Sequence, residues 1–388
     1  MVFTSRTTAL KPEGAYQVLA RAQAMEASGR EIIHLEIGQP DVDTFANISQ
    51  AGIQAISEGK TRYNPPAGIM ELRQAIAEEA GSTRGIEITP EEVVVSPGAK
   101  PNLFFPTLAL ANPGDEVIYP DPGFPSYEAM INVAEGVPVP VPLSEEKKFS
   151  FDLEVFDTLV NARTKLIILN SPGNPTGGVI PLADLEHIAD AALRYDCWVL
   201  SDEIYARITY DGRQAASIAS FPGMMERTVI IDGFSKTYAM TGWRLGFGIM
   251  PRELARRVEL LLTHSIGCSA HFTQYAGLEA LAGPQEQANH LVEMFQARRD
   301  VIVEGLNQIV GVRCQIPQGA FYVFPNVKAF GRSSEELANL LLDEAGVAVL
   351  PGSSFGKFGE GYLRLSYANS IENIENGLER IKEVLVSL

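Results

Sequence analysis

Three segments of this chain carry polar side chains of the kinds that could bind and activate a small charged molecule. They lie at residues 170–177, 201–205 and 233–246, and each follows an apolar run of the type that forms buried strands. An amine among these groups could form an imine with an aldehyde, while the other groups hold the rest of that molecule. The five groups belong to Asn174, Asp202, Tyr205, Lys236 and Arg244.

Pyridoxal phosphate is an aldehyde cofactor whose parts match this set. Its aldehyde suits Lys236, because a lysine desolvated in a crevice loses basicity and can form a Schiff base. Ser235 and Arg244 place a hydroxyl and a guanidinium close to this lysine, as a phosphate clamp requires. The alternative for Lys236 is an exposed loop lysine without a chemical role.

Asp202 follows the apolar run 197–201, so we expect it at the carboxyl end of a buried strand, where open α/β sheets bind ligands. A carboxylate there could keep a pyridine nitrogen protonated and the ring an electron sink. Asn174 and Tyr205 could donate hydrogen bonds to the ring oxygen and favour its ionised form. The alternatives are a helix N-cap for Asp202 and a half-buried aromatic for Tyr205.

Residues 96–100, Ser-Pro-Gly-Ala-Lys, follow a strand-like run and precede a helical one. A turn of small residues at a helix N-terminus exposes backbone N–H groups to a phosphate, which would involve Gly98, Ala99 and Lys100. An ordinary turn between strand and helix has the same appearance. Phe124 could stack on the cofactor ring, although a single aromatic is more often part of a core.

Arg364 lies inside the apolar, strand-like run 361–367, where a charge is costly unless it is paired. Its partner could be the carboxylate of a ligand, bound through two hydrogen bonds, or an internal Asp or Glu. Tyr63 lies in a turn-rich loop and indicates little by itself. The five histidines have no ligand spacing, so we expect no metal site.

The overall composition restricts the classes of function. The chain has 388 residues and a formal net charge of -17, which argues against nucleic acid as a partner. Its three cysteines are far apart and odd in number, so we expect a reducing compartment, the cytoplasm, rather than a disulfide framework. We find no apolar run that would form a signal peptide or a membrane span.

Short apolar runs alternate with helical patterns through the first two thirds of the chain. This rhythm predicts an α/β fold with a mostly parallel sheet covered by helices on both faces. One predicted helix covers 182–193 and starts at Pro181. From about residue 285 the pattern changes to a long helix, a hairpin-like segment at 319–324 and a closing helix from Ile371, which indicates a second, α+β domain. The predicted strands lie at 93–95, 116–119, 165–169, 198–200, 229–231 and 245–249.

The three segments together resemble the class I, fold type I pyridoxal phosphate aminotransferases, and the resemblance runs from residue 37 to Arg364. Ser-Pro-Gly-Asn-Pro-Thr-Gly, Ser-Asp-Glu-Ile-Tyr and Ser-Lys-x(5)-Gly-Trp-Arg-Leu-Gly occur in that order. The resemblance, closest to the aspartate aminotransferase subgroup, implies a seven-stranded, mainly parallel sheet in a large domain at 46–285. Residues 286–388 would form a small domain, joined by the N-terminal arm and the rest of 1–45.

The resemblance also implies a role for each site residue. Lys236 would be the Schiff-base lysine and the proton shuttle, and Asp202 would pair with the pyridine nitrogen. Asn174 and Tyr205 would hold the ring oxygen, with Tyr205 counted among the catalytic residues. A substrate α-carboxylate would bind Gly38, Asn174 and Arg364. Tyr63 would reach the phosphate of the neighbouring subunit, which implies a homodimer with shared sites. The groups expected to hold the cofactor are Lys236, Asp202, Tyr205, Asn174, Gly98, Ala99, Lys100, Phe124, Ser235, Arg244 and Tyr63.

The reaction implied by the resemblance moves an amino group between an L-amino acid, aspartate or a broader range, and a 2-oxo acid such as 2-oxoglutarate. Two departures bear on the substrate. Phe124 stands where many aspartate-specific relatives have tryptophan, and residues 263–271 lack the arginine that reads a distal carboxylate in the dicarboxylate-specific branch. Alternatives on the same fold are a β-eliminating C–S lyase, a γ-cyclising synthase, a non-catalytic regulator and a purely structural dimer.

Overall fold

A seven-stranded sheet forms the centre of the computed structural model, which describes residues 3–8, 10 and 12–388. The strand order is β2-β8-β7-β6-β5-β3-β4, and every neighbouring pair is parallel except those that involve β8. This architecture confirms the predicted α/β class with a mainly parallel sheet. The strands are β2 (Val93–Ser96), β3 (Glu116–Asp121), β4 (Val137–Pro142), β5 (Thr164–Asn170), β6 (Trp198–Asp202), β7 (Thr228–Gly233) and β8 (Gly246–Ile249).

Helices cover both faces of this sheet, because alternate residues of the buried strands point to opposite sides. Leu166 and Ile168 of β5 pack in one hydrophobic cluster with α5, α6 and α9, while Ile167 and Leu169 pack in another with α8. The other end of that second face is covered by α4 and α10. The helices are α3 (Ala46–Ser57), α4 (Met70–Arg84), α5 (Lys100–Leu110), α6 (Ser126–Val133), α7 (Leu153–Leu159), α8 (Leu182–Arg194), α9 (Arg252–Thr263) and α10 (His271–Ala282).

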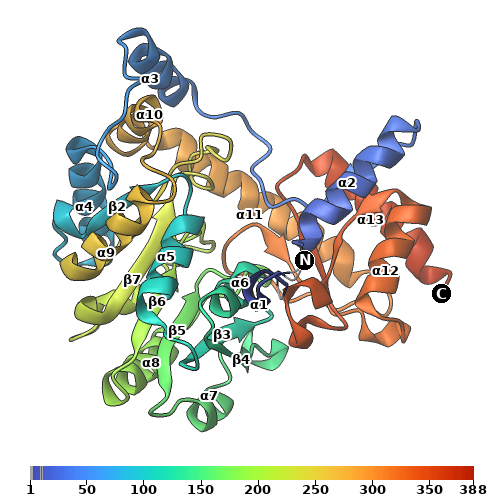
Figure 1. Cartoon of the computed structure of the whole chain (residues 1–388). Helices are drawn as coiled ribbons and strands as arrows, with labels where there is room; N and C mark the ends of the chain where they lie inside the picture. The colour runs from blue at the N-terminus through green and yellow to red at the C-terminus, as the bar shows by residue number, and fades with distance from the viewer. Residues whose placement is uncertain (1–2, 9, 11) are drawn as a thin grey trace.

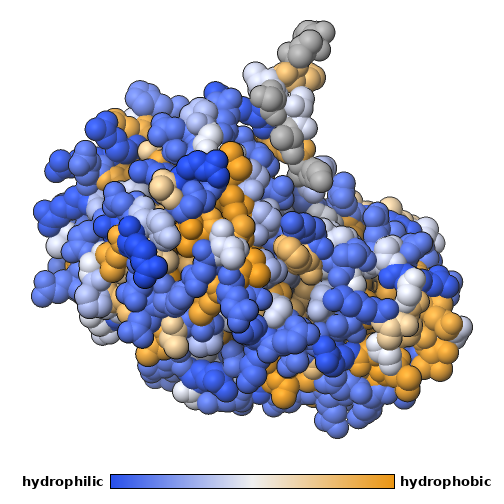
Figure 2. All heavy atoms as spheres, turned by 90° about the horizontal axis from the view of Figure 1, so that it is seen from below, coloured by the Kyte–Doolittle hydropathy of each residue, from blue (hydrophilic) through white to orange (hydrophobic). Residues whose placement is uncertain are grey.

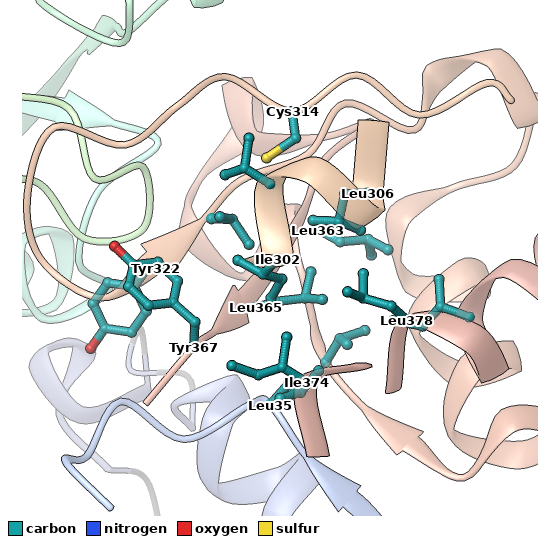
Figure 3. Packing of buried hydrophobic residues seen from close by; sticks show 14 of the residues in the cluster. Leu35, Ile302, Leu306, Cys314, Tyr322, Leu363, Leu365, Tyr367, Ile374 and Leu378 are labelled. Carbon is teal, nitrogen blue, oxygen red and sulfur yellow. The ribbon is translucent and has the colours of Figure 1, made fainter. Parts of the chain in front are cut away.

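The remaining elements form a second lobe, to the right in Figure 1, which combines both ends of the chain. The first strand pairs in parallel with a strand near the C-terminus, with Ile33 beside Val347. Figure 3 shows Leu35 packing with Ile302, Leu365 and other apolar side chains of this lobe. The elements are α2 (Gly14–Ala27), β1 (Ile33–His34), α11 (Glu286–Asn307), β9 (Tyr322–Val323), α12 (Ser334–Leu340), β10 (Val347–Ala348), β11 (Leu350–Pro351), β12 (Leu363–Ser366) and α13 (Ile371–Val386). The short helix α1 (Ser5–Thr8) lies against α6 of the sheet lobe, where Arg6 forms an ion pair with Glu135.

Three local expectations need correction. Residues 319–324 form no hairpin; instead, β9 pairs antiparallel with β12, about forty residues later in the chain, so that Tyr322 lies beside Ser366. Pro181 precedes α8 as its N-cap residue rather than occupying its first turn. The sequence of the N-terminal arm, residues 1 to about 15, shows no clear periodicity, yet the arm contains α1, and α2 already begins at Gly14. The predicted domain boundaries, 45/46 and 285/286, stay a prediction.

The predicted strand list lacked β4, whose sequence is Val-Pro-Val-Pro-Val-Pro. Proline cannot donate to a ladder, so it is confined to edge strands and bulges. β4 occupies the edge of the sheet and pairs only with β3 there. The missing N–H groups therefore cost the sheet no hydrogen bonds with a second neighbour.

The surface fits the acidic composition. On the face seen in Figure 2, hydrophilic residues predominate and hydrophobic residues gather in a few patches. Across residues 3–8, 10 and 12–388, no helix combines the length and apolar character needed to cross a membrane. The same part of the chain contains no cluster of three or more His, Cys, Asp or Glu side chains suited to a metal ion.

Candidate active site

A cavity of about 550 Å³ opens at the carboxyl end of the central strands, between the sheet and the second lobe. Ligands of open α/β sheets bind at this edge. Of the predicted site residues, Tyr63 lies outside the cavity with 97% of its surface exposed, and Gly98 lies next to the lining residue Ala99. The others line it: Gly38, Ala99, Lys100, Phe124, Asn174, Asp202, Tyr205, Ser235, Lys236, Arg244 and Arg364.

The parallel pairing of β5 with β6 brings two of the three sequence segments together. Asn170, the last residue of β5, is in register with Asp202, the last residue of β6. The Asn170 Nδ2 donates to the backbone carbonyl of Asp202 at 3.0 Å, and its Oδ1 accepts from the Asn174 N–H at 2.8 Å. Asn170 therefore holds the Asn174 turn against the end of the neighbouring strand.

Asp202 is buried and held by two donors. The Tyr127 hydroxyl donates to its Oδ2 at 2.7 Å, and the Ile204 N–H donates to its Oδ1 at 3.3 Å. Burial raises the pKa of Asp202 to about 6, partly opposed by the hydrogen bond from Tyr127. At neutral pH Asp202 is therefore largely an ionised carboxylate, suited to pair with a cationic group in the cavity.

A network of charges fixes the strand ends behind Asp202. The neighbouring Glu203 accepts from the hydroxyls of Ser201 and Ser217, at 2.8 and 2.6 Å, and from Arg84 at 2.7 Å. Arg84 also donates to Asp232 of β7 at 2.8 Å. Adjacent residues of a strand point to opposite faces. Since Glu203 points into this network, the Asp202 side chain points into the cavity. It ties the ends of β6 and β7 to α4.

Lys236 lies in the loop after β7, and its Nζ donates to the backbone carbonyl of Gly38 at 2.5 Å. The rings of Tyr205 and Phe321 lie 5.9 and 5.7 Å from the same nitrogen. Burial lowers the pKa of Lys236 to about 8, and the cations of Arg364 and Arg244 add to this effect. A substantial neutral fraction near pH 8 makes this amine a nucleophile.

Arg364, on β12, is a buried cation with only 4% of its surface exposed. It donates to the Asn174 Oδ1 at 3.1 Å and to the backbone carbonyl of Glu36, while its Nε has no hydrogen-bond partner. Burial lowers the pKa of Arg364. Among the described residues, no carboxylate forms an ion pair with it, so the internal Asp or Glu considered from the sequence is not its partner.

The part of the cavity lining formed by the start of α5 and Arg244 is suited to bind an anion. α5 begins at Lys100, and the first N–H groups of a helix lack intrahelical partners. Gly98 has a φ of +80°, and a Cβ at this position would overlap the guanidinium of Arg244. Arg244 donates to the Thr241 carbonyl at 2.9 Å. The glycine therefore lets a cation lie against the start of the helix.

The Lys100 side chain points to a different partner from the one expected. Its Nζ forms an ion pair with Glu13, which also accepts from the Ser126 hydroxyl at 3.1 Å. The same ammonium lies 5.0 Å from the Phe124 ring centroid. Lys100 thus has a backbone N–H at the helix start and a side-chain charge elsewhere along the cavity lining. The expected phosphate contact of Lys100 stays a prediction.

Sequence reasoning missed four residues of this site, namely Glu13, Asn170, Tyr127 and Tyr322. Asn170 and Tyr127 had a usable signal, because Asn170 begins the segment 170–177 and Tyr127 follows Phe124 by three residues, and a buried carboxylate such as Asp202 needs hydrogen-bond donors. Glu13 and Tyr322 had none, since they are far from the motifs along the chain.

The low pKa of Lys236 predicts how the cofactor-free protein reacts with added pyridoxal phosphate. Only the neutral amine attacks an aldehyde, so the rate should rise with pH and level off near pH 8, whereas an ordinary lysine would continue to gain reactivity up to about pH 10. Stopped-flow absorbance measures this rate, with Lys236→Ala as the control for other lysines. A midpoint near pH 10 would contradict the burial of this amine.

Comparisons with known proteins agree with this geometry. The sequence profile of the family described as aminotransferase class I and II matches residues 30–381. The aspartate aminotransferase of Pyrococcus abyssi is 41% identical over 362 residues, covering 92% of this chain and 93% of that protein. The aromatic-amino-acid aminotransferase 2 of Thermococcus litoralis is 38% identical over 388 residues, covering 99% and 98%.

Solved structures of aminotransferases have the same fold as this chain. The aspartate aminotransferase from Thermus thermophilus with maleate superposes with a TM-score of 0.94 at 38% identity, covering 99% of this chain and all of that one. The aromatic aminotransferase from Pyrococcus horikoshii has a TM-score of 0.90 at 40% identity, covering 94% and 99%. On this evidence the chain belongs to the aminotransferase class I and II family and is an aminotransferase that acts on an amino acid and a 2-oxo acid.

Proposed function

We propose that this aminotransferase is pyridoxal phosphate-dependent and that Arg364 selects α-amino and 2-oxo acids by their α-carboxylate. The observation that carries the proposal is the buried guanidinium without a carboxylate partner, in the same cavity as the buried amine of Lys236. A buried charge is costly unless it is paired, and a ligand carboxylate would pair it. Asn174, already bonded to Arg364, would share that carboxylate.

The donor set fits each part of the cofactor. Asp202, ionised at neutral pH, suits a protonated pyridine nitrogen. Tyr205 has a pKa raised well above its ordinary value by burial, so it stays a neutral donor for the ring oxygen, with Asn174 beside it. Ser235, Arg244 and the start of α5 suit a phosphate. Phe124 lines the cavity where a ring could stack on it.

When bound, pyridoxal phosphate supplies the electron sink that stabilises negative charge at the substrate Cα. The residues of the chain do the rest. Arg364 and Asn174 orient the substrate through its carboxylate. Lys236 would accept the proton from the substrate Cα as a neutral amine and, as an ammonium, would return it to the former aldehyde carbon of the cofactor, a role that a pKa near 8 serves in both directions. Asp202 keeps the ring nitrogen protonated.

The first test follows visible absorbance while L-amino acids are added one at a time to the purified, cofactor-loaded protein. We expect a band at about 360–430 nm that falls with one class of donor and returns with 2-oxoglutarate. Lys236→Ala should keep cofactor binding and lower turnover by about 10³-fold or more, because the proton transfer loses its base. Pyruvate and ammonia from a single amino acid, without exchange, would instead favour the β-eliminating lyase. The relatives named above are all aminotransferases.

We propose that the side chain of the donor is read by Lys100 and Glu13. Among the described residues, four cations line the cavity, and three are assigned to the covalent link, the phosphate and the α-carboxylate. Lys100 remains for a distal carboxylate, which would replace Glu13 as its partner. When Glu13 stays paired with Lys100, the charge of Lys100 is compensated, and the cavity can accept an aromatic or aliphatic side chain. Relatives named for aspartate and for aromatic amino acids both fit this arrangement.

Substitutions of this pair should separate the two classes of donor. Lys100→Met should lower kcat/KM for aspartate about 10- to 100-fold, the effect of losing a charged hydrogen bond, and leave an aromatic donor within about threefold. Glu13→Gln should change the ratio in the opposite direction, because it frees the ammonium. Steady-state kinetics with aspartate and phenylalanine measure the ratio. An equal loss for both donors in Lys100→Met would remove Lys100 from substrate reading.

We propose a homodimer with shared active sites, formed through the side of the sheet lobe that carries α3, α4 and α10, at the upper left of Figure 1. Apolar side chains are exposed there, including Ile53 (56%), Ile56 (49%) and Met70 (50%). Large exposed apolar patches mark interaction sites. Tyr63 lies in the loop between α3 and α4, so a second copy on this surface would bring the partner subunit's Tyr63 towards the phosphate side of the cavity.

A hybrid dimer tests the shared site. In a dimer of one Lys236→Ala subunit and one Tyr63→Ala subunit, one site carries both substitutions and the other carries neither. Hybrids co-expressed and purified on two affinity tags should therefore retain about half of the wild-type sites, measured as activity at limiting pyridoxal phosphate. Each variant expressed alone is the control. Mixed preparations no more active than the sum of the parents, or a monomer in light scattering, would refute the shared site.

We also propose a reducing, cytoplasmic location and the domain division 1–45, 46–285 and 286–388. The free thiols of Cys197, Cys268 and Cys314 support the location. The pairing of β1 with β10 supports joining part of the N-terminal segment to the C-terminal domain.

A further inference from the structure

We propose that Tyr322 is a positioning residue that couples the substrate-binding Arg364 to Tyr205 on the cofactor side. This inference rests on the proposed function. Tyr322 belongs to β9 of the second lobe and is almost completely buried, with 1% of its surface exposed, yet it lines the cavity. Its hydroxyl and its ring contact different parts of the site.

The Tyr322 hydroxyl lies 2.7 Å from the Tyr205 hydroxyl, and the two rings are nearly perpendicular at 84°. Each hydroxyl has one proton to donate. If Tyr205 donates its proton to an ionised oxygen of the cofactor ring, it can only accept in the bond with Tyr322. Tyr322 must then be the donor, and it strengthens Tyr205 as a donor by polarising its hydroxyl.

The pKa values bear on whether both protons are available for these donations. Burial raises the pKa of Tyr205 well above its ordinary value and also raises that of Tyr322. Both phenols therefore keep their protons at any working pH, so that two protons are present for two donations. No other direction of the bond leaves the Tyr205 proton free for a ligand.

The Tyr322 ring supports the guanidinium of Arg364, whose central carbon lies 4.5 Å from the ring centroid. The contact is a cation–π interaction in a desolvated place, where such contacts are strongest. β9 and β12 are paired, with Tyr322 opposite Ser366, so the same strand pair carries both residues. A substrate carboxylate that binds Arg364 therefore also affects Tyr322, which orients Tyr205 through its hydroxyl.

Gly38 is part of the same arrangement. A Cβ at this position would overlap the Tyr322 hydroxyl, and the Gly38 carbonyl accepts from Lys236 at 2.5 Å. The close approach of this backbone to Tyr322 thus brings the carbonyl within reach of the lysine. It gives a physical reason for glycine at 38 apart from any contact with substrate.

The test uses the cofactor-loaded enzyme and compares Tyr322→Phe with wild type. A hydrogen-bond donor to the ring oxygen stabilises the ionised oxygen and so lowers the pKa of the proton that this oxygen shares with the Lys236 nitrogen. Removing the Tyr322 hydroxyl weakens that donor, so the midpoint of the pH titration of the visible band should rise by about 0.5, as expected for one net hydrogen bond. In the Tyr205→Phe background the same substitution should cause no further rise, because Tyr322 acts through Tyr205.

Tyr367→Phe is the matched control, because it also removes a buried hydrogen bond between two tyrosines. The Tyr367 hydroxyl donates to the Tyr210 hydroxyl at 3.2 Å, and neither residue lines the cavity. It should leave the titration unchanged. Tyr322→Leu removes the ring as well and should also raise KM for the amino acid about tenfold, whereas Tyr322→Phe should leave KM nearly unchanged. If the Phe variant does not fold, Tyr322→Met replaces it in the titration; because Met lacks the ring too, KM is then expected to rise as in Tyr322→Leu.

The outcomes distinguish the two proposals. A wild-type protein without a visible band would overturn the proposed function. A wild-type band that transaminates, with an unchanged midpoint in Tyr322→Phe or an equal rise in the Tyr205→Phe background, would overturn the role of Tyr322 alone. Equilibrium binding of pyridoxal phosphate to the cofactor-free variants provides a readout independent of turnover, with weaker binding expected for Tyr322→Phe and unchanged binding for Tyr367→Phe.

Discussion

The parallel register of β5, β6 and β7 is the constraint on which the site depends. Parallel neighbours end at the same edge of a sheet, so residues distant in sequence meet there without a special device. Asn170 and Asp202 are in register, and Lys236 follows β7 by three residues. A shift of one residue in β6 would turn Asp202 to the opposite face and bring Glu203 to the cavity. The Arg84 network, which holds Glu203 and Asp232 from behind, opposes such a shift.

Charge is distributed differently on the two sides of this edge. Behind the strands, Arg84 is paired with two carboxylates, Glu203 and Asp232, and the network is complete. Inside the cavity, within the part of the chain that the structure describes, Arg364 has no carboxylate partner and Lys236 donates only to a backbone carbonyl. Breaking the first arrangement would leave charges uncompensated, whereas the second is completed by a ligand. The contrast separates a structural charge cluster from a binding site within one chain.

Most of the fold could be predicted because buried parallel strands are short continuous apolar runs, and six of the seven were recognisable in this way. β4 was not, because alternating proline hides a strand that only an edge position permits. The partner of β9 could not be predicted either. Local sequence favours pairing with a close neighbour, whereas the second lobe pairs β9 with β12 and β1 with β10, where apolar burial of Leu35, Leu363 and Leu365 decides the arrangement.

The sequence alone determined which chemical groups are present and that most lie at strand ends, because the motifs are local and strand patterns are periodic. Tertiary structure decided which groups are paired. It gave Asp202 a donor in Tyr127, placed Glu13 against Lys100, put Tyr322 between Tyr205 and Arg364, and left Arg364 without an internal acid. These contacts join residues up to 117 positions apart, and no local periodicity encodes them, since they depend on how distant segments pack.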